Sequence, residues 1–309
     1  MAHLAIEHPR RTAVHVAVLA ACVGLLAYQL RAVEFGSLFS TVRPVWLILA
    51  VAGFAVSMGA AAHNISAFAP LRLRAVDTMR AQLAIGGLRV IAPAAVSTPA
   101  IGTRFLVRKG LPTSTAVTVL AVAQSAQLIM TIVVVGGIAL LASTELPTPS
   151  PAVLLIGAVV VAALAGIAIV ARRMPVVART VTGAKTSVLT IGAHLRHHPA
   201  RVASGLGASG LLTLTHIGAF VCCVHAVGGH ASLIAMTAVY LGAASAGSLV
   251  PTPGGVGAVE SALISGLIAA GLAPQTAAAA AVLSRLVTVW LPAIPGLVAL
   301  RGLRRDGLL

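Results

Sequence analysis

The sequence predicts an all-α fold, a polytopic membrane helix bundle of about eight transmembrane helices plus one re-entrant or broken helix. Of the 309 residues, 59% are hydrophobic and only 9% are charged, and the mean hydropathy is +1.03. Most of the apolar stretches approach the ~20 residues that a spanning helix needs. Residues 1–309 are therefore expected to form a single integral membrane domain, because no polar stretch is long enough to bury a core of its own.

Apolar stretches follow one another along the chain. They lie at about 12–30, 45–63, 81–96, 115–142, 152–171, 202–228, 231–250, 256–273 and 276–300. The first is expected to remain as a helix, because it has spanning length and no convincing cleavage site of a signal peptide follows it. The third is the weak one, since Gly86, Gly87, Arg89 and Pro93 interrupt it. We expect this stretch to be tilted or to re-enter the membrane from one side.

Basic residues in the loops give the chain a consistent orientation if the weak stretch does not cross. The positive-inside rule assigns Lys- and Arg-rich loops to the cytoplasm. Those loops include the long basic loop 172–201, whereas 143–151 and 228–231 carry no Lys or Arg. Both termini are then cytoplasmic, in what we expect to be a bacterial inner membrane. Only the first loop, which contains Arg31 and Arg43, does not fit.

Composition argues against several other classes of protein. The net charge of +15 is explained by topology and by contact with anionic lipid headgroups. Nucleic acid is not an expected partner, since aromatic residues that could stack on bases are only 3% of the chain. The cysteines lie in apolar stretches, and the histidines of 194–198 lie in a basic loop without a nearby carboxylate or thiol. No metal, nucleotide or other cofactor is expected.

The decamer 251–260 lies between two apolar stretches and reads Pro-Thr-Pro-Gly-Gly-Val-Gly-Ala-Val-Glu. Pro251 and Pro253 lack amide donors and disfavour helix in the residues before them, so a straight helix cannot pass through. The residues that permit positive φ and close backbone approach are Gly254, Gly255 and Gly257. Backbone without helical partners at membrane depth must be buried in protein or line a polar cavity.

A helix that begins near Val256 would direct free amides and the positive end of its dipole toward the glycines before it. We therefore expect an anion site at this break. A phosphate or phosphodiester headgroup is the membrane-resident anion that fits it, and Arg285 could add a charge-assisted hydrogen bond.

Glu260 is the only acidic residue that we expect at membrane depth, where an ionisable group is by default a functional candidate. Gly271 and Pro274 mark a turn, with Glu260 12 or 13 residues before its centre and Arg285 12 or 13 after it. Both then lie roughly 18–20 Å from the tip of a helical hairpin, and an ion pair is expected. The pair could merely pin the hairpin. Alternatively Glu260 orients Arg285 toward a ligand, with proton coupling as the second choice.

An internal repeat divides the chain into a first half at about 45–142 and a second at about 202–301. The pattern Leu-x-x-x-Gly-Leu-x-x-x-Thr-Ala begins at residue 106 and recurs 161 residues later, at residue 267. The same offset sets Gln124 against Arg285. A proline-and-glycine break at 93–102 precedes the first copy, as the decamer precedes the second. Broken helices in corresponding halves are the best sequence pointer to the binding site of a transporter.

Three further residues are candidates for the same cavity. Arg104 and Arg89 could supply a second headgroup contact from the first half, or they could extend to the membrane interface. Gln124 could face the cavity, or it could form a hydrogen bond between helices.

The chain resembles the flippase-like transmembrane domain of the lysylphosphatidylglycerol synthase family, the membrane half of the bacterial multiple-peptide-resistance-factor proteins. The resemblance covers about residues 12–301. It is carried by Pro251-x-Pro253-Gly254-Gly255-x-Gly257-x-x-Glu260, by Gly271, Ala277 to Ala281 and Arg285, and by the region of Pro93, Gly102 and Arg104. Residues 100–103 lack the Gly-Glu step that many relatives have before the arginine.

In full-length relatives, an acyltransferase-like domain transfers lysine from lysyl-tRNA to phosphatidylglycerol, and the membrane domain moves the product to the outer leaflet. This chain ends at Leu309 without such a domain, so the resemblance implies the transport activity and no enzyme activity. Membrane phospholipids are the expected partners.

Three classes of function are open at this point. The first is a flippase or scramblase for an anionic or aminoacylated phospholipid or a polyprenyl-phosphate lipid. The second is a carrier for a small polar solute, and the third is a non-transporting subunit that binds or scaffolds a separate lipid-modifying enzyme. A homo-oligomer is an open alternative for the assembly.

Overall fold

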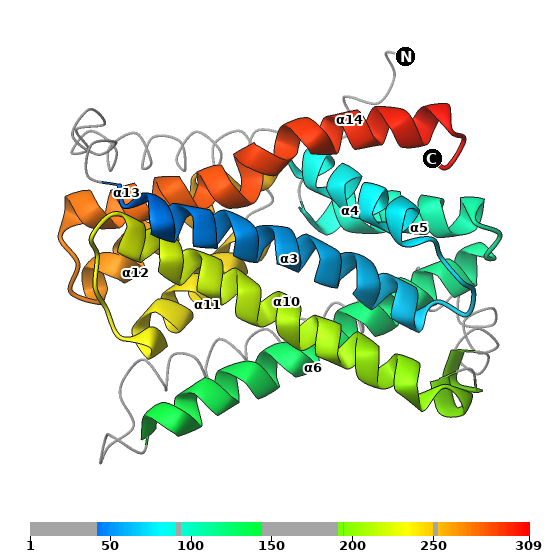
Figure 1. The fold of residues 1–309 in the computed structure, drawn as a ribbon, viewed down its shortest axis with the longest axis horizontal. Coiled ribbons are helices and arrows are strands. Elements are labelled where there is room, and N and C mark those ends of the chain that lie inside the picture. Colours follow the sequence, from blue (N-terminus) through cyan, green and yellow to red (C-terminus); the bar gives the residue numbers. More distant parts are fainter. Residues whose placement is uncertain (1–41, 91–93, 144–190, 194, 250–252) are drawn as a thin grey trace, which may run out of the picture.

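The computed structural model describes residues 42–90, 94–143, 191–193, 195–249 and 253–309 (Figure 1). Within these ranges every regular element is a helix. Several predictions lie outside the described residues: the spans at 12–30 and 152–171, most of the basic loop 172–201, Pro93 and Pro251.

The helices fall into two consecutive sets. The first comprises α3 Pro44–Phe68, α4 Ala75–Arg89, α5 Ala94–Arg108 and α6 Thr113–Ser143. The second comprises α10 Pro199–Ala226, α11 Leu233–Leu249, η1 Pro253–Gly255, α12 Ala258–Ala269, α13 Pro274–Arg285, η2 Leu286–Trp290 and α14 Leu291–Arg305. Proline occupies the first turn of α3, α10, α13 and α14, where its missing N–H costs no hydrogen bond and its φ suits a helix.

Four continuous helical segments are long and apolar enough to cross a bilayer. They are Pro44–Phe68, Thr113–Ile138, Pro199–Ala226 and the joined helices Pro274–Arg305. The outward face of α3 exposes large apolar side chains, among them Val45 and Ile48, which are 65% and 66% exposed. Such a surface is stable against lipid tails and not against water. These segments therefore support a multi-pass membrane protein.

The predicted spans at 231–250 and 256–273 are shorter in the structure. α11 has 17 residues and α12 has 12, and 12 residues rise only roughly 18 Å, less than the ~30 Å of a bilayer core. α12 is therefore too short to cross alone, and the prediction that it spans is wrong. Glycine turns at both ends are the physical cause. The turn at 254–257 delays the start of the helix to Ala258 instead of the expected Val256, and the turn at Gly271 ends it at Ala269.

The two copies of the repeated sequence pattern end their helices in the same way. In the first half, the amides of Gly110 and Leu111 donate to the carbonyls of Val107 and Leu106, at 2.9 and 3.2 Å. At the same offset of 161 residues, Gly271 and Leu272 donate to Ile268 and Leu267, at 2.9 and 3.0 Å. Gly110 and Gly271 both have positive φ, +101° and +94°, the usual way to end a helix.

The two halves run in opposite directions. α3 and α10 lie side by side and antiparallel (Figure 1). At one end the amide of Arg43 donates to the carbonyl of Ala226 at 2.8 Å, and at the other Arg201 donates to the carbonyl of Ser66 at 2.8 Å. Two similar sets of helices with opposite direction are the arrangement that many transporters use.

Each half contributes a helical hairpin that returns to the end where it began. α4 and α5 lie at one end of the molecule, and α11 and α12 lie at the other (Figure 1). Lys109 at the end of α5 pairs with Asp77 at the start of α4, 2.6 Å apart. The end of α4 approaches the glycine turn before α12, since the carbonyl oxygen of Arg89 lies 3.5 Å from the position that a Cβ on Gly254 would occupy.

α4 crosses α14 at very short range. A Cβ on Gly87 would lie 2.6 Å from the backbone carbon of Gly296, and a Cβ on Gly296 would lie 2.6 Å from the amide nitrogen of Gly87. No side chain fits between the two backbones, so glycine is required at both positions.

Basic residues gather at the end of the molecule that holds α4 and α5. Arg80 pairs with Asp306 at 2.8 Å, Lys109 pairs with Asp77, and Arg104 and Arg304 line one cavity. Arg43 lies at the opposite end, beside Ala226. The predicted separation of basic loops to one side, with Arg43 as an exception, is therefore present in the part of the chain that the structure describes.

Candidate functional site

The break before α12 is a tight glycine turn. Gly254, Gly255 and Gly257 all have positive φ, at +65°, +69° and +87°, conformations that cost a residue with a Cβ of order 1 kcal/mol or more. Pro253 to Gly255 form the short helix η1, and Gly257 is the N-cap of α12. The prediction that these glycines adopt conformations closed to other residues is confirmed.

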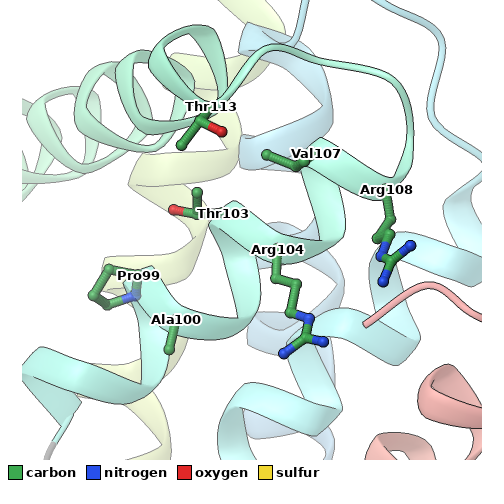
Figure 2. Close-up of a pocket in the computed structure, with 7 residues that line it drawn as sticks. All are labelled: Pro99, Ala100, Thr103, Arg104, Val107, Arg108 and Thr113. Atoms are coloured by element: carbon green, nitrogen blue, oxygen red, sulfur yellow. The ribbon is translucent and has the colours of Figure 1, made fainter.

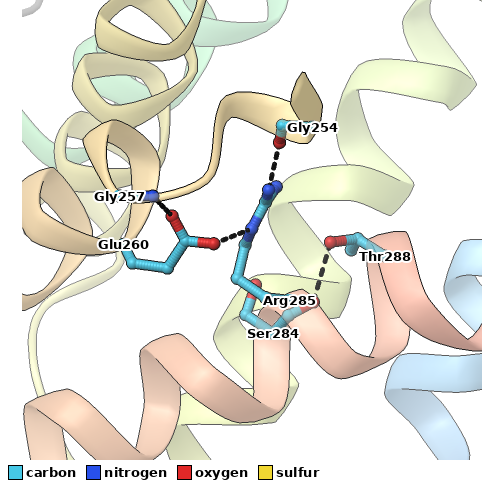
Figure 3. A network of polar contacts seen from close by, with 6 residues as sticks. All are labelled: Gly254, Gly257, Glu260, Ser284, Arg285 and Thr288. Atoms are coloured by element: carbon cyan, nitrogen blue, oxygen red, sulfur yellow. Dashed lines mark hydrogen bonds and ion pairs between the residues drawn. The ribbon is translucent and has the colours of Figure 1, made fainter. Parts of the chain in front are cut away.

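Glu260 fills the start of its own helix (Figure 3). Its Oε2 accepts a hydrogen bond from the amide of Gly257 at 2.8 Å. This is half of a capping box, and the other half cannot form because the N-cap glycine has no side chain. The expectation of free amides there for a ligand is wrong in one respect: a carboxylate of the chain itself occupies the amide of Gly257.

The other oxygen of the same carboxylate holds Arg285. Arg285 Nε donates to Glu260 Oε1 at 2.7 Å, and the two side chains are 12% and 7% exposed. The predicted ion pair is thus present, at corresponding depths of the hairpin α12–α13. Arg285 Nη2 also donates to the carbonyl of Gly254. Glu260, Arg285 and Gly254 therefore form one connected polar group, with a charged pair buried among helices.

Arg285 is the last residue of α13, directly before a wider turn. Residues 286–290 form the π-helix η2, and Thr288 Oγ1 donates to the carbonyl of Ser284 at 2.7 Å. Pro292 has no N–H and its ring crowds the carbonyl of Thr288, which favours a local widening of the helix. Such π-turns often occur at functional sites.

A second arginine reaches this site from the first half. Arg89 is the last residue of α4 and is exposed. Its carbonyl oxygen lies 3.5 Å from the position that a Cβ on Gly254 would occupy, and its Nη2 donates to Thr98 Oγ1 on α5 at 3.3 Å. The backbone of Arg89 therefore lies beside Gly254, while its guanidinium donates to Thr98 on α5.

Two further polar residues, which are not among the predicted site residues, belong to the same region. Tyr240 on α11 lies within electrostatic range of both Arg89 and Arg285. His216 on α10 lies within range of Arg89, and its ring centroid is 6.5 Å from that of Tyr240. Tyr240 is one of only two tyrosines in the chain, and its position inside an apolar stretch was the signal that could have identified it.

Gln124 and Arg104 are not among the residues around Gly254. Gln124 is exposed on α6, because its helix is continuous and has no hairpin break opposite it. Arg104 lines a separate cavity on α5 (Figure 2). The grouping that the structure makes is Glu260, Arg285, Gly254 and Arg89.

One family covers almost the whole chain. The lysylphosphatidylglycerol synthase TM region matches residues 12–296. The chain belongs to this family. That confirms the resemblance derived from the decamer and Arg285, and it identifies the chain as a membrane domain of the kind associated with the synthesis and flipping of aminoacyl-phospholipids.

The family match concerns the transmembrane region alone; no synthase domain is matched. No curated protein matches the chain. The site of Glu260 and Arg285 lies within the matched region, so its geometry can be considered in the context of a membrane protein.

Proposed function

We propose that this protein moves a phospholipid with an anionic phosphate headgroup between the two leaflets of the membrane. The observation that carries the proposal is the group formed by Glu260, Arg285 and Gly254 at the break of the second hairpin, with Arg89 of the first hairpin beside it. Lipid tails and apolar side chains cannot solvate such charges, so the group needs an aqueous or ligand-filled space.

The charge balance favours an anion as the ligand. Arg285 and Arg89 bring two positive charges to this region, and the one carboxylate, Glu260, is shared between Arg285 and the amide of Gly257. Arg285 Nη1 has no hydrogen-bond partner among the described residues, and a guanidinium can donate two parallel bonds to a phosphate. Within a bilayer, a phospholipid headgroup is the abundant ligand of this kind.

Glu260 has a positioning role in this proposal. Its carboxylate holds Nε of Arg285 and the carbonyl of Gly254 holds Nη2, which leaves Nη1 for a ligand. Because Glu260 also caps α12, the position of Arg285 is linked to the start of that helix. Without the carboxylate, the side chain of Arg285 would therefore be free to rotate away from the ligand.

The opposite direction of the two halves supplies a route between leaflets. In this proposal the α4–α5 and α11–α12 hairpins enter from opposite membrane faces, and their breaks meet near the midplane. A rocking of one half against the other would then open the site to each leaflet in turn. The basic end of the molecule would face the cytoplasm by the positive-inside rule.

The test is headgroup accessibility in proteoliposomes that carry labelled phosphatidylglycerol, lysyl-phosphatidylglycerol or a polyprenyl phosphate. We expect exchange between leaflets for the wild type, and a loss of at least about tenfold for Glu260→Gln and Arg285→Lys, since a charged hydrogen bond contributes ~1.5–3 kcal/mol. Asp306→Asn is the matched control, because it removes a carboxylate from an ion pair at the surface.

Two outcomes would contradict the proposal. If folded wild-type protein exchanges none of these lipids, a scaffold for a lipid-modifying enzyme explains the chain better. If it instead carries a water-soluble anion across sealed vesicles without lipid exchange, the solute-carrier alternative is favoured.

A further inference from the structure

Two adjoining cavities open beside α5, away from the Glu260–Arg285 site. The larger has a volume of about 650 Å³ and is lined by Pro99, Ala100, Thr103, Arg104, Val107, Arg108 and Thr113 (Figure 2). The smaller, of about 450 Å³, shares Ala100 and Arg104 with it and reaches α14 through Leu300 and Arg304. Arg104 therefore stands between the two cavities.

The arginines of these cavities have no side-chain carboxylate as a partner. Arg104, Arg108 and Arg304 are exposed, and none forms an ion pair within the described ranges. The side-chain carboxylates of the described part of the chain are Asp77, Glu260 and Asp306, and each is already paired with another cation.

Two of these arginines are close enough along the helix to repel each other. Arg104 and Arg108 stand four residues apart on one face of α5, where like charges destabilise a helix. Figure 2 shows both side chains on the same side of that helix. An anion between or beside them would remove the repulsion and gain charge-assisted hydrogen bonds.

Apart from Thr103 and Thr113 in the larger cavity, the rest of the lining is apolar. Pro99 and Val107 face the larger cavity, and Leu88 and Leu300 face the smaller one. A free phosphate ion would use only the guanidinium groups, whereas an anionic lipid would use the apolar walls as well. The cavities lie at the basic end of a membrane protein, where headgroups of anionic lipids are enriched.

We propose that α5 and the end of α14 form a peripheral binding site for one anionic phospholipid, with its phosphate held by Arg104, Arg108 and Arg304. This site is separate from the one that contains Glu260 and Arg285, and it does not depend on the proposed translocation. In the second half, the positions that correspond to Arg104 and Arg108 are Ser265 and Ala269. The site therefore belongs to one face of the membrane only.

The test is lipid binding to the full chain in detergent, followed by native mass spectrometry with phosphatidylglycerol and with phosphatidylcholine. We expect Arg104→Gln combined with Arg304→Gln to reduce the preference for phosphatidylglycerol roughly tenfold. Arg301→Gln combined with Arg305→Gln is the matched control, because it removes the same charge from exposed positions of α14 that line neither cavity.

Several results would overturn the site. An equal loss in both double variants would mean that only the overall surface charge attracts the lipid. Inorganic phosphate that competes as well as short-chain phosphatidylglycerol would mean that the apolar walls are not used. Glu260→Gln separates this proposal from the translocation proposal, since it should abolish exchange and leave this lipid preference unchanged.

Discussion

The two halves of the molecule end one pair of helices in the same way, and they differ in the residues that surround those helix ends. The turns at Gly110 and Gly271 carry the same hydrogen bonds, and the buried leucines before them, Leu106 and Leu267, are both fully enclosed. Yet the position of Glu260 in the second half is Pro99 in the first. The repeat therefore preserves the helix ends and packing, and it does not preserve the charged pair.

Arginine is distributed between the halves in a complementary way. The second half has Arg285 where the first has the exposed Gln124, and the first half has Arg104 and Arg108 at positions that are uncharged in the second. The helix after the turn differs as well: α6 is continuous, whereas a π-turn follows Arg285. The second half thus carries the buried pair of Glu260 and Arg285, whereas the first half carries Arg104 and Arg108 at an exposed cavity.

The largest difference in stability should appear when the side chains of Arg285 and of Gln124, its counterpart in the first half, are replaced. Arg285→Gln leaves Glu260 buried without its cation, and we expect a loss of ~3–5 kcal/mol in the free energy of unfolding. Gln124→Ala should stay within about 0.5 kcal/mol, because its side chain is exposed. Denaturation in mixed micelles measures both.

The double variant Glu260→Gln/Arg285→Gln serves as the control for this first prediction. It should regain part of the lost stability, since no unpaired charge remains. A single Arg285→Gln variant as stable as the wild type would mean that the pair is solvated and not buried.

The buried leucines at corresponding positions of the two halves should contribute equally to stability. Leu106→Ala and Leu267→Ala each empty a fully buried position before a glycine turn, and each should cost ~2–5 kcal/mol. We expect the two losses to agree within about 1 kcal/mol, because the local packing and hydrogen bonds correspond. Unfolding of the two variants side by side tests this; clearly unequal losses would limit the repeat to its backbone.

Substitution at the α4–α14 crossing, where the two halves touch, should have a smaller effect on stability. The neighbouring glycine serves as the control. Gly87→Ala places a Cβ 2.6 Å from the backbone of Gly296, and overpacking of this kind costs ~1–3 kcal/mol. Gly86→Ala meets nothing within 4 Å and should be neutral or stabilising by about 0.5–1 kcal/mol. Thermal unfolding of both variants checks the prediction, and a destabilised Gly86→Ala would contradict it.

The smallest effect concerns the ion pair between Lys109 and Asp77, which joins the end of α5 to the start of α4. The hydrogen bond from Lys109 lowers the pKa of Asp77 below its ordinary value of 3.8, whereas the corresponding residues of the second half are Ala238 and Ala270. A lowered folded-state pKa gives stability that is present above the unfolded pKa and lost as the pH falls through the folded one.

Asp77→Asn should therefore cost under about 1 kcal/mol at neutral pH. The difference from the wild type should disappear as the pH falls below the ordinary value of an aspartate. Thermal unfolding across that range measures it. A difference that persists at the acid end would assign the effect to packing and not to charge.

The ion pair could be predicted from the sequence because helix rise is regular. Counting residues from a glycine turn gives depth, and Glu260 and Arg285 stand at similar distances from that turn. The capping role of Glu260 could not be obtained in the same way. It depends on Gly257 as the N-cap, and glycine has no side chain that would mark a capping box in the sequence.

Contacts between the halves could not be obtained from the sequence. Arg89 was a candidate for the same cavity, but its position beside Gly254 depends on how α4 packs against the second half, and Tyr240 joins the region from a third helix. The length of α12 was overestimated because apolar composition does not reveal where glycine ends a helix. Arg104 was a candidate for the central site or for the membrane interface, and its place in a cavity that α14 also lines has no local signature in the sequence.

The bond between Glu260 and Arg285 has a consequence for selectivity. A lone guanidinium at this depth would hold any small anion, and chloride would occupy the protein continuously. With Glu260 present, the pair is electrically neutral when empty, so a simple ion gains little by entering. Under the proposed function, only a ligand with additional contacts can compete with the carboxylate, and the same competition ensures that the ligand leaves again.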